Sequence, residues 1–349
     1  MAYTTINKSS LNMNTKLYTG NGGTLTVSGV GFQPNFTWLK GRSFADYHVL
    51  TDSVRGVNSQ VYSNDAGSQG SQTNGITSFN SDGFVLGNWS NTNKASNTHV
   101  GWNWKAGTSF SNSAGANGAS IASTGSINTA AGFSVVKWTG SGSNATIGHG
   151  LGTKPSMLMV KNTTATGGWR VWHQNLTSTQ TLQLNTTAAV NTSAGQFNSS
   201  ATFNSTVFSV GGEGDTNESG STIIAYCFAD KQGYSKFGKY SANANVDGTF
   251  VYTGFKPTFI LIKASNSAQD GQSWFIYDSS RDSGNTATQT LQPNTNAAEQ
   301  TNVAPIDILS NGFKLRTNTG RINGTNGEYI YMAFGQSIVG TNNIPATAF

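Results

Sequence analysis

The chain has 349 residues, of which only 10% are charged, and it combines 42 glycines with 36% hydrophobic residues. A disordered chain of low complexity would also be rich in glycine, but it would lack the 19 Phe, 11 Tyr and 8 Trp present here. The net charge of +5 comes from 20 basic residues without a run of Lys or Arg, which argues against nucleic acid as a partner. Turn formers together with aromatic residues are typical of an all-β fold with many short strands.

Further features narrow the class of protein. Cys227 is the only cysteine, so an internal disulfide is excluded. No apolar stretch reaches the length of about 18 residues that a membrane-spanning helix requires, so we expect no membrane insertion. The first ten residues are polar, so we expect no secretory signal.

The repeated pattern begins after residues 1–16, which we expect to form an N-terminal arm. The phrase GFQPNFTWLK (31–40) places a turn and Pro34 before a short apolar run that ends in Lys40. Proline cannot donate to a β-ladder, so it suits the first residue of a strand. We expect the lysine to stop the strand where the chain returns to water.

This phrase occurs three times, because Pro155 and Pro257 are also followed six residues later by a lysine, Lys161 and Lys263. Further phrases recur in the same order, and each copy closes on HVGWNW (99–104), IIAYCF (223–228) or YIYMAF (329–334). The closing runs alternate with a period of two, which predicts a half-buried strand. A repeat of roughly a hundred residues has the size of a domain rather than of a solenoid unit. We therefore predict three tandem β-sandwich modules, lectin-like or jelly-roll-like, that arose by internal triplication.

The predicted boundaries follow the composition. Module 1 is expected at 17–110, module 2 at 131–230, and module 3 at 231–349 with a short C-terminal tail. Residues 111–130 between the first two modules are rich in Gly, Ser and Ala, which predicts a flexible or extended linker. Tyr234, Phe237 and Tyr240 predict instead a packed joint between modules 2 and 3.

A catalytic signature is missing from the sequence. There is no nucleophile elbow, HExxH motif, Walker loop or dinucleotide fingerprint. The four histidines lack metal-ligand spacing, and the 15 acidic residues do not cluster as a glycosidase pair would. We expect a protein that is not an enzyme and has neither a cofactor nor a metal.

One charged pair does recur, Asp52 with Arg55 and Asp278 with Arg281. Residues three apart can close a turn through a charge-assisted hydrogen bond. Module 2 has His173 and no arginine at the matching places, so we interpret the pair as a structural clamp rather than a catalytic site.

Two tryptophans lie in polar loops, Trp89 in GNWSNTNK (87–94) and Trp169 in TGGWRVW (166–172). An amphipathic ring in such a loop suits contact with a sugar or a protein, although it can also fold back as a plug. The loops 88–97, 163–170 and 265–273 differ among the copies while the strands recur, so we expect any ligand-binding residues there, with Trp89 and Trp169 as the candidates.

Over nearly its whole length the chain resembles a structural protein of marine tailed bacteriophages. The phrases that carry the resemblance include LYTGNGG (17–23), GFQPNFTWLKGRS (31–43), SFNSDGFVLG (78–87), GHGLGTKPSMLMVKN (148–162) and GTFVYTGFKP (248–257). The resemblance implies a virion component, assembled in the host cytoplasm and grouped with tail-fibre or receptor-binding proteins. Its partners would be other virion proteins and a host surface glycan or receptor, and it would form a homo-oligomer, a trimer by analogy with tail fibres.

Two other functions stay open at this point. A capsid decoration or knob protein would stabilise the shell and bind no host ligand. A depolymerase for surface glycan is disfavoured because carboxylates are scarce.

Overall fold

Short antiparallel strands make up the fold, in keeping with a sequence rich in aromatic residues and turn formers. The structure is a computed structural model that describes residues 3–177, 179–198, 202–269, 271–337 and 339. Its helices are single turns, namely α1 (Ser90–Asn93), α2 (Ala194–Phe197), α3 (Gly214–Asn217) and the 3-10 turns η1 (Ser9–Leu11), η2 (Ala116–Gly118) and η3 (Ser267–Gln269). None of the described helices is long and apolar enough to span a membrane. The predicted all-β class is confirmed.

Module 1 is a sandwich of two sheets. Its inner sheet has the order β1 (Met13–Thr19), β9 (Thr98–Trp104), β3 (Phe36–Gly41), β4 (Val49–Asp52), β5 (Ser59–Tyr62) and β6 (Gly70–Ser71). Its outer sheet has the order β2 (Leu25–Ser28), β8 (Gly83–Leu86) and β7 (Ile76–Asn80). Leu39, Val49 and Phe84 are buried between the two sheets.

Module 2 repeats this arrangement with an addition at one edge. Its inner sheet has the order β10 (Thr108–Asn112), β11 (Ser123–Asn128), β12 (Phe133–Thr139), β19 (Thr222–Phe228), β14 (Met157–Asn162), β15 (Arg170–His173), β16 (Gln180–Gln183) and β17 (Asn191–Thr192). Its outer sheet pairs β13 (Ala145–Gly148) with β18 (Val207–Val210).

Module 3 has an inner sheet of order β20 (Ser235–Ser241), β27 (Glu328–Gln336), β22 (Lys256–Ala264) and β23 (Phe275–Asp278). Its outer sheet has the order β21 (Phe250–Tyr252), β26 (Gly312–Leu315), β25 (Gln300–Leu309) and β24 (Ala287–Thr290). In every module the first strand of the repeat pairs with the closing strand, which pairs with the proline–lysine strand. Internal triplication stays our interpretation of this repeated order.

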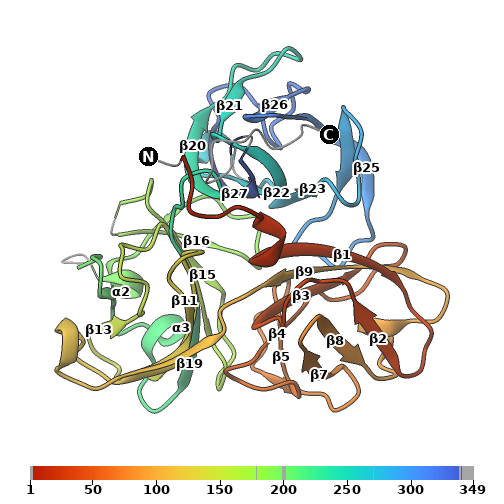
Figure 1. Ribbon diagram of the computed structural model, residues 1–349. Coiled ribbons are helices and arrows are strands. Elements are labelled where there is room, and N and C mark those ends of the chain that lie inside the picture. Colours follow the sequence, from red (N-terminus) through yellow and green to blue (C-terminus); the bar gives the residue numbers. More distant parts are fainter. Residues whose placement is uncertain (1–2, 178, 199–201, 270, 338, 340–349) are drawn as a thin grey trace.

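The three modules surround a common core rather than lying in a row (Figure 1). Trp104, Phe228 and Phe334, one from each closing strand, meet edge to face, with ring centroids 5.9–6.2 Å apart. The opposite faces of the same strands pack inside the separate sandwiches, as Cys227 and Tyr331 do. The expectation of half-buried closing strands is therefore wrong, because a neighbouring module covers the face that would otherwise meet water.

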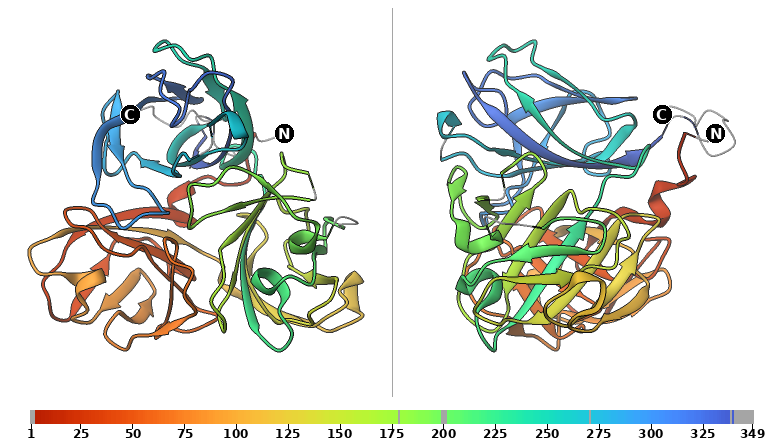
Figure 2. Two further views of the ribbon diagram at one scale, coloured as in Figure 1. Left: turned by 180° about the vertical axis from the view of Figure 1, so that it is seen from behind. Right: turned by 90° about the vertical axis from the view of Figure 1, so that its left-hand side faces the viewer.

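The N-terminal arm ends earlier than predicted. β1 already starts at Met13, and residues 3–12 lie against module 3. The Tyr3 hydroxyl donates to the carbonyl of Gly254, and the Ser9 amide donates to Oε1 of Gln336. Ahead of β1 the described part of the arm runs from beside module 3 toward module 1 (Figures 1 and 2).

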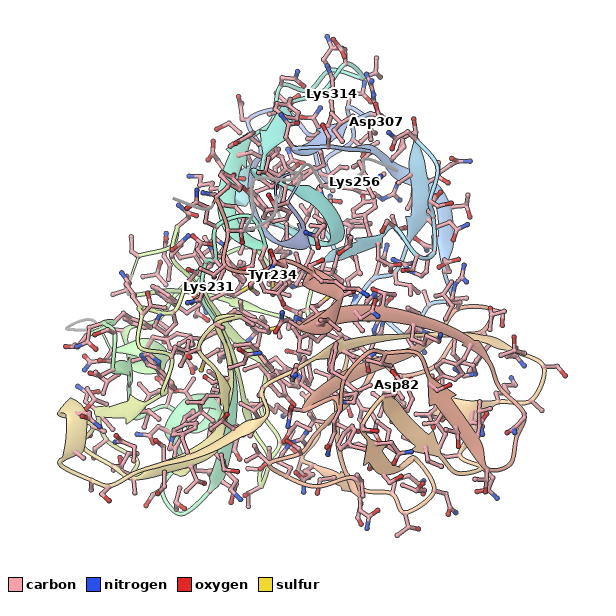
Figure 3. All side chains as sticks on the ribbon, in the orientation of Figure 1. Asp82, Lys231, Tyr234, Lys256, Asp307 and Lys314 are labelled. Carbon is pink, nitrogen blue, oxygen red and sulfur yellow. The ribbon has the colours of Figure 1, made fainter. Side chains whose placement is uncertain are left out.

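The segment expected to be a linker is ordered. β10 and β11 form a hairpin, and β11 pairs with β12 over its whole length, from Ser123 opposite Trp138 to Asn128 opposite Phe133. Small polar residues still satisfy a β-ladder when a sheet edge is available, which is why composition misled us. The packed joint between modules 2 and 3 is confirmed for Tyr234 (labelled in Figure 3) and Phe237, which are buried in the common core, whereas Tyr240 lies in the core of module 3.

Candidate binding surface

The repeated lysines lie at the joints between modules. Lys40, Lys161 and Lys263 are fully buried, so the expectation that they exit to water is wrong. Each ammonium donates to a carbonyl of its own module and to one of a neighbour, namely Phe44 and Asn296 for Lys40, Gly167 and Ala66 for Lys161, and Gln272 and Thr187 for Lys263. Burial lowers the pKa of Lys40 and of Lys161 to about 8. The lysines link module 1 to 3, 2 to 1 and 3 to 2, which closes the ring.

The first Asp/Arg pair is also part of a joint. The Arg55 Nε lies 2.6 Å from Oδ2 of Asp52, and both side chains are almost completely buried. The hydroxyl of Tyr226, from module 2, donates to the same Asp52 oxygen at 2.9 Å. Burial raises the pKa of Tyr226 well above its usual value, so the hydroxyl keeps its proton and acts as a donor.

The other two joints carry matching contacts. Arg281 pairs with Asp278, whose Oδ2 accepts a hydrogen bond of 2.9 Å from the indole Nε1 of Trp102 in module 1. In module 2, His173 Nδ1 accepts from a backbone amide, so Nε2 carries the proton and donates to the Tyr331 carbonyl of module 3 at 3.2 Å. These groups are satisfied within the fold, which agrees with a structural clamp.

Trp169 belongs to a joint as well. It is fully buried, and its Nε1 donates to the carbonyl of Tyr62 in module 1 at 2.8 Å. Trp274 makes the same contact from module 3 to Gln183 of module 2, at 2.9 Å. Because the Trp169 ring is not accessible, the expectation that it binds a ligand is wrong. The loop 163–170 packs against module 1 through the Gly167 amide, which donates to Ala66.

Trp89 differs, because it lies half-buried at the surface of module 1. It is the residue before α1, and the amides of Thr92 and Asn93 donate to its carbonyl. The buried Asn93 amide group donates to the carbonyls of Gly23 and Gly87 at 2.6 and 2.8 Å, which fixes the loop.

Two tyrosines extend the Trp89 ring into an aromatic surface. The Tyr62 ring lies 6.4 Å from Trp89 and 4.6 Å from Tyr47, measured between centroids. Tyr47 is 41% exposed, and the three rings are tilted by 52° and 32° across the two contacts. We call Tyr47, Tyr62 and Trp89 the aromatic surface of module 1.

Polar groups border this surface. Gln60 is fully buried beside Trp89, and its Oε1 has no hydrogen-bond partner among the described residues. Because this oxygen is buried, a ligand on the aromatic surface does not reach it. Burial raises the pKa of Tyr62, and Tyr47 and the carboxylates of Asp65 and Asp46 raise it further.

A comparison with known protein families finds a match over the residues that form the three modules. A family model described as "Domain of unknown function (DUF7483)" matches residues 8–337. The chain belongs to the DUF7483 family. The match runs from the arm to the end of β27, so the DUF7483 domain contains all three modules and their common core. Comparison with curated proteins finds no match.

The aromatic surface breaks the symmetry of the DUF7483 domain. Gln183 occupies the strand position in module 2 that Tyr62 occupies in module 1. The residue before α3, which corresponds to Trp89 before α1, is Glu213. Our sequence reasoning missed Tyr47, which precedes β4, and Tyr62, which ends β5. Within the described residues, no group of three or more His, Cys, Asp or Glu could hold a metal ion.

Proposed function

We propose that the chain is a non-enzymatic structural protein of a bacteriophage particle that contacts a host surface saccharide through the aromatic surface of module 1. The observation that carries this proposal is the exposed ring of Tyr47 next to Tyr62 and Trp89. The C–H face of a pyranose packs on such rings, while its hydroxyl groups can donate to the carboxylates of Asp46 and Asp65 near Tyr62.

The rest of the molecule supports a role as a rigid carrier of this surface. The joints are formed by buried lysines and ion pairs rather than by linkers, so the loops of module 1 are held by the whole chain. The resemblance to virion proteins of marine tailed phages supports a tail fibre or a tail-associated host-recognition subunit. Several copies, in a homotrimer, would then raise a weak single contact to useful avidity.

The test is Tyr47→Ala, since Tyr47 is exposed and its loss leaves the core intact. One stacked ring contributes about 1–1.5 kcal/mol, so we expect roughly a ten-fold loss of affinity for isolated host envelope polysaccharide. Tyr252→Ala is the matched control, because Tyr252 is 59% exposed on module 3 and should bind as the parent does. Equal binding by all three proteins refutes the aromatic surface as the contact.

A second candidate, a capsid decoration protein, is favoured by one observation. The three modules share a strand order and a central triangle of rings, so a single chain has an approximately threefold shape. Such a chain suits a threefold position on a shell. For this candidate, particles carrying Tyr47→Ala would adsorb normally, and particles without the protein would lose heat stability.

A further inference from the structure

Equivalent lysines occur on the first strands of modules 2 and 3. Lys137 on β12 pairs with Ile224 of the closing strand, and Lys239 on β20 pairs with Ile330 at the same position of its module. Lys239 is neutralised, because its Nζ lies 2.6 Å from Oε2 of Glu328. This contact holds the pKa of Glu328 below its usual value.

Lys137 lacks the corresponding carboxylate. Glu328 lies opposite Ser241, and the equivalent pair in module 2 is Thr222 opposite Thr139. Thr222 therefore occupies the place of Glu328. Among the described residues Lys137 has no ion pair, although the same position in module 3 has one.

Two adjoining cavities meet at Lys137. They have volumes of about 380 and 400 Å³, and both are lined by Thr124 and Lys137. The first is completed by Ala122, Ser123, Trp138, Thr139 and Thr222. The second is completed by Asn35, Ser53, Val54, Gly107, Ser109, Phe110, Gly125 and Ser126. Among the described residues that line them, none is acidic and seven of the fifteen are serine or threonine.

The hairpin β10–β11 creates this groove. The hairpin lies between modules 1 and 2, whereas modules 2 and 3 are connected only by the short turn 229–234. A ligand in the groove would contact Thr124 and Lys137, which are cross-strand neighbours on β11 and β12. The groove is therefore found at the joint between modules 1 and 2, and it surrounds the ammonium group of Lys137, which has no ion pair among the described residues.

We propose that the groove binds an anionic polysaccharide, with a carboxylate or sulfate group on Lys137 in the place that Glu328 occupies beside Lys239. The ammonium supplies a charge-assisted hydrogen bond, and the exposed hydroxyl groups of Thr124 and Thr139 hydrogen-bond to the sugar. The site shares no residue with the aromatic surface, so it does not rest on the function proposed for that surface.

The decisive variant is Thr222→Glu, which supplies an internal carboxylate and copies the pair of module 3 while leaving Lys137 in place. Thr98→Glu is the matched control, because Thr98 is the equivalent residue of module 1 and the net charge changes equally. The probes are polygalacturonate for carboxylate, dextran sulfate for sulfate and dextran as the neutral polymer, in titration calorimetry with the full chain. Thermal unfolding should give the same midpoint for both variants.

We expect the parent and Thr98→Glu to bind at least one anionic polymer, to bind dextran at least ten-fold more weakly, and to lose affinity as salt is added. Thr222→Glu and Lys137→Met should each bind the anionic polymer at least ten-fold more weakly than the parent does. If polygalacturonate binds and dextran sulfate does not, the anion is a carboxylate; the reverse result identifies a sulfate. The proposal is overturned if the parent prefers neither anionic polymer to dextran, or if both Thr222→Glu and Lys137→Met bind as Thr98→Glu does.

Discussion

Removing one ring from the central triangle, with Phe228→Ala, tests whether the modules depend on their common core. Phe228 is fully buried, and its ring centroid lies 6.2 Å from Trp104 of module 1 and 6.0 Å from Phe334 of module 3. Burying a phenylalanine side chain contributes about 1.5–3 kcal/mol, and the cavity left by its removal adds a further loss. Because aromatic residues of all three modules surround the site, it cannot collapse easily, and we expect a loss of about 3–5 kcal/mol.

The assay is equilibrium unfolding in urea, followed by tryptophan fluorescence and by circular dichroism. The tryptophans are distributed over all three modules, so the two signals should change together in one transition that moves to lower urea as a whole. Phe250→Ala is the control, since Phe250 is 44% exposed on an edge strand. If Phe228→Ala loses no more than this control, or if only the module 2 tryptophans change earlier, the common core is not what holds the modules together.

Three further predictions concern the joints and the assembly. Asp278→Asn removes one of the two carboxylates that pair with the buried Arg281, leaving Glu299, and should cost about 1.5–3 kcal/mol in urea unfolding; a loss below about 0.5 kcal/mol would contradict the clamp. Burial lowers the pKa of His173 to about 4, so the folded chain takes up its proton at lower pH than the unfolded chain, and stability should be complete above about pH 6.5 and fall toward pH 4. At pH 5 this residue lowers the free energy of unfolding by about 2 kcal/mol. His173→Gln should therefore reduce the difference in unfolding free energy between pH 7.5 and pH 5. If that difference is unchanged, other residues cause the acid sensitivity. Sedimentation at micromolar concentration should give a homotrimer, and a stable monomer would refute that expectation.

The strands could be predicted because their signals are local. The period of two in the closing runs and the apolar run after each proline are properties of a few adjacent residues. The run after the second proline, Met157 to Val160, is apolar throughout, and its two faces pack into two different cores. The strand faces and side chains that a neighbouring module covers could not be predicted, because contacts between distant segments leave no periodicity in the sequence.

The lysines and Trp169 illustrate this limit. A lysine at the end of a strand usually reaches water, and here carbonyl groups from another module replace the water. Trp169 follows two glycines and resembles a loop residue, but its indole N–H bonds to Tyr62, about a hundred residues away. Asn103, a polar residue inside a closing strand, is instead satisfied within module 1, since it accepts from Thr37 and donates to the carbonyl of Asn14. The recurrence of a lysine in three copies was the available signal for a buried role.

The site was predictable only in part. Trp89 was identified from a bulky ring in a polar loop, and the structure places it at the surface as expected. Tyr47 and Tyr62 join it through the pairing of β4 with β5, which brings together residues that are fifteen positions apart. The unpaired Lys137 became visible only when its equivalent, Lys239, was seen to have a carboxylate partner.

Whether the chain is part of a phage particle, and where it lies there, tests the proposed function most directly. Intact particles would be labelled with gold-conjugated antibody raised against the full chain and viewed by electron microscopy, with antibody from unimmunised animals as the control. A host-recognition protein that presents the aromatic surface predicts label at the tail, and the free antibody should block adsorption to host cells. Label spread over the capsid with unaffected adsorption, or particles that carry no label, would contradict it.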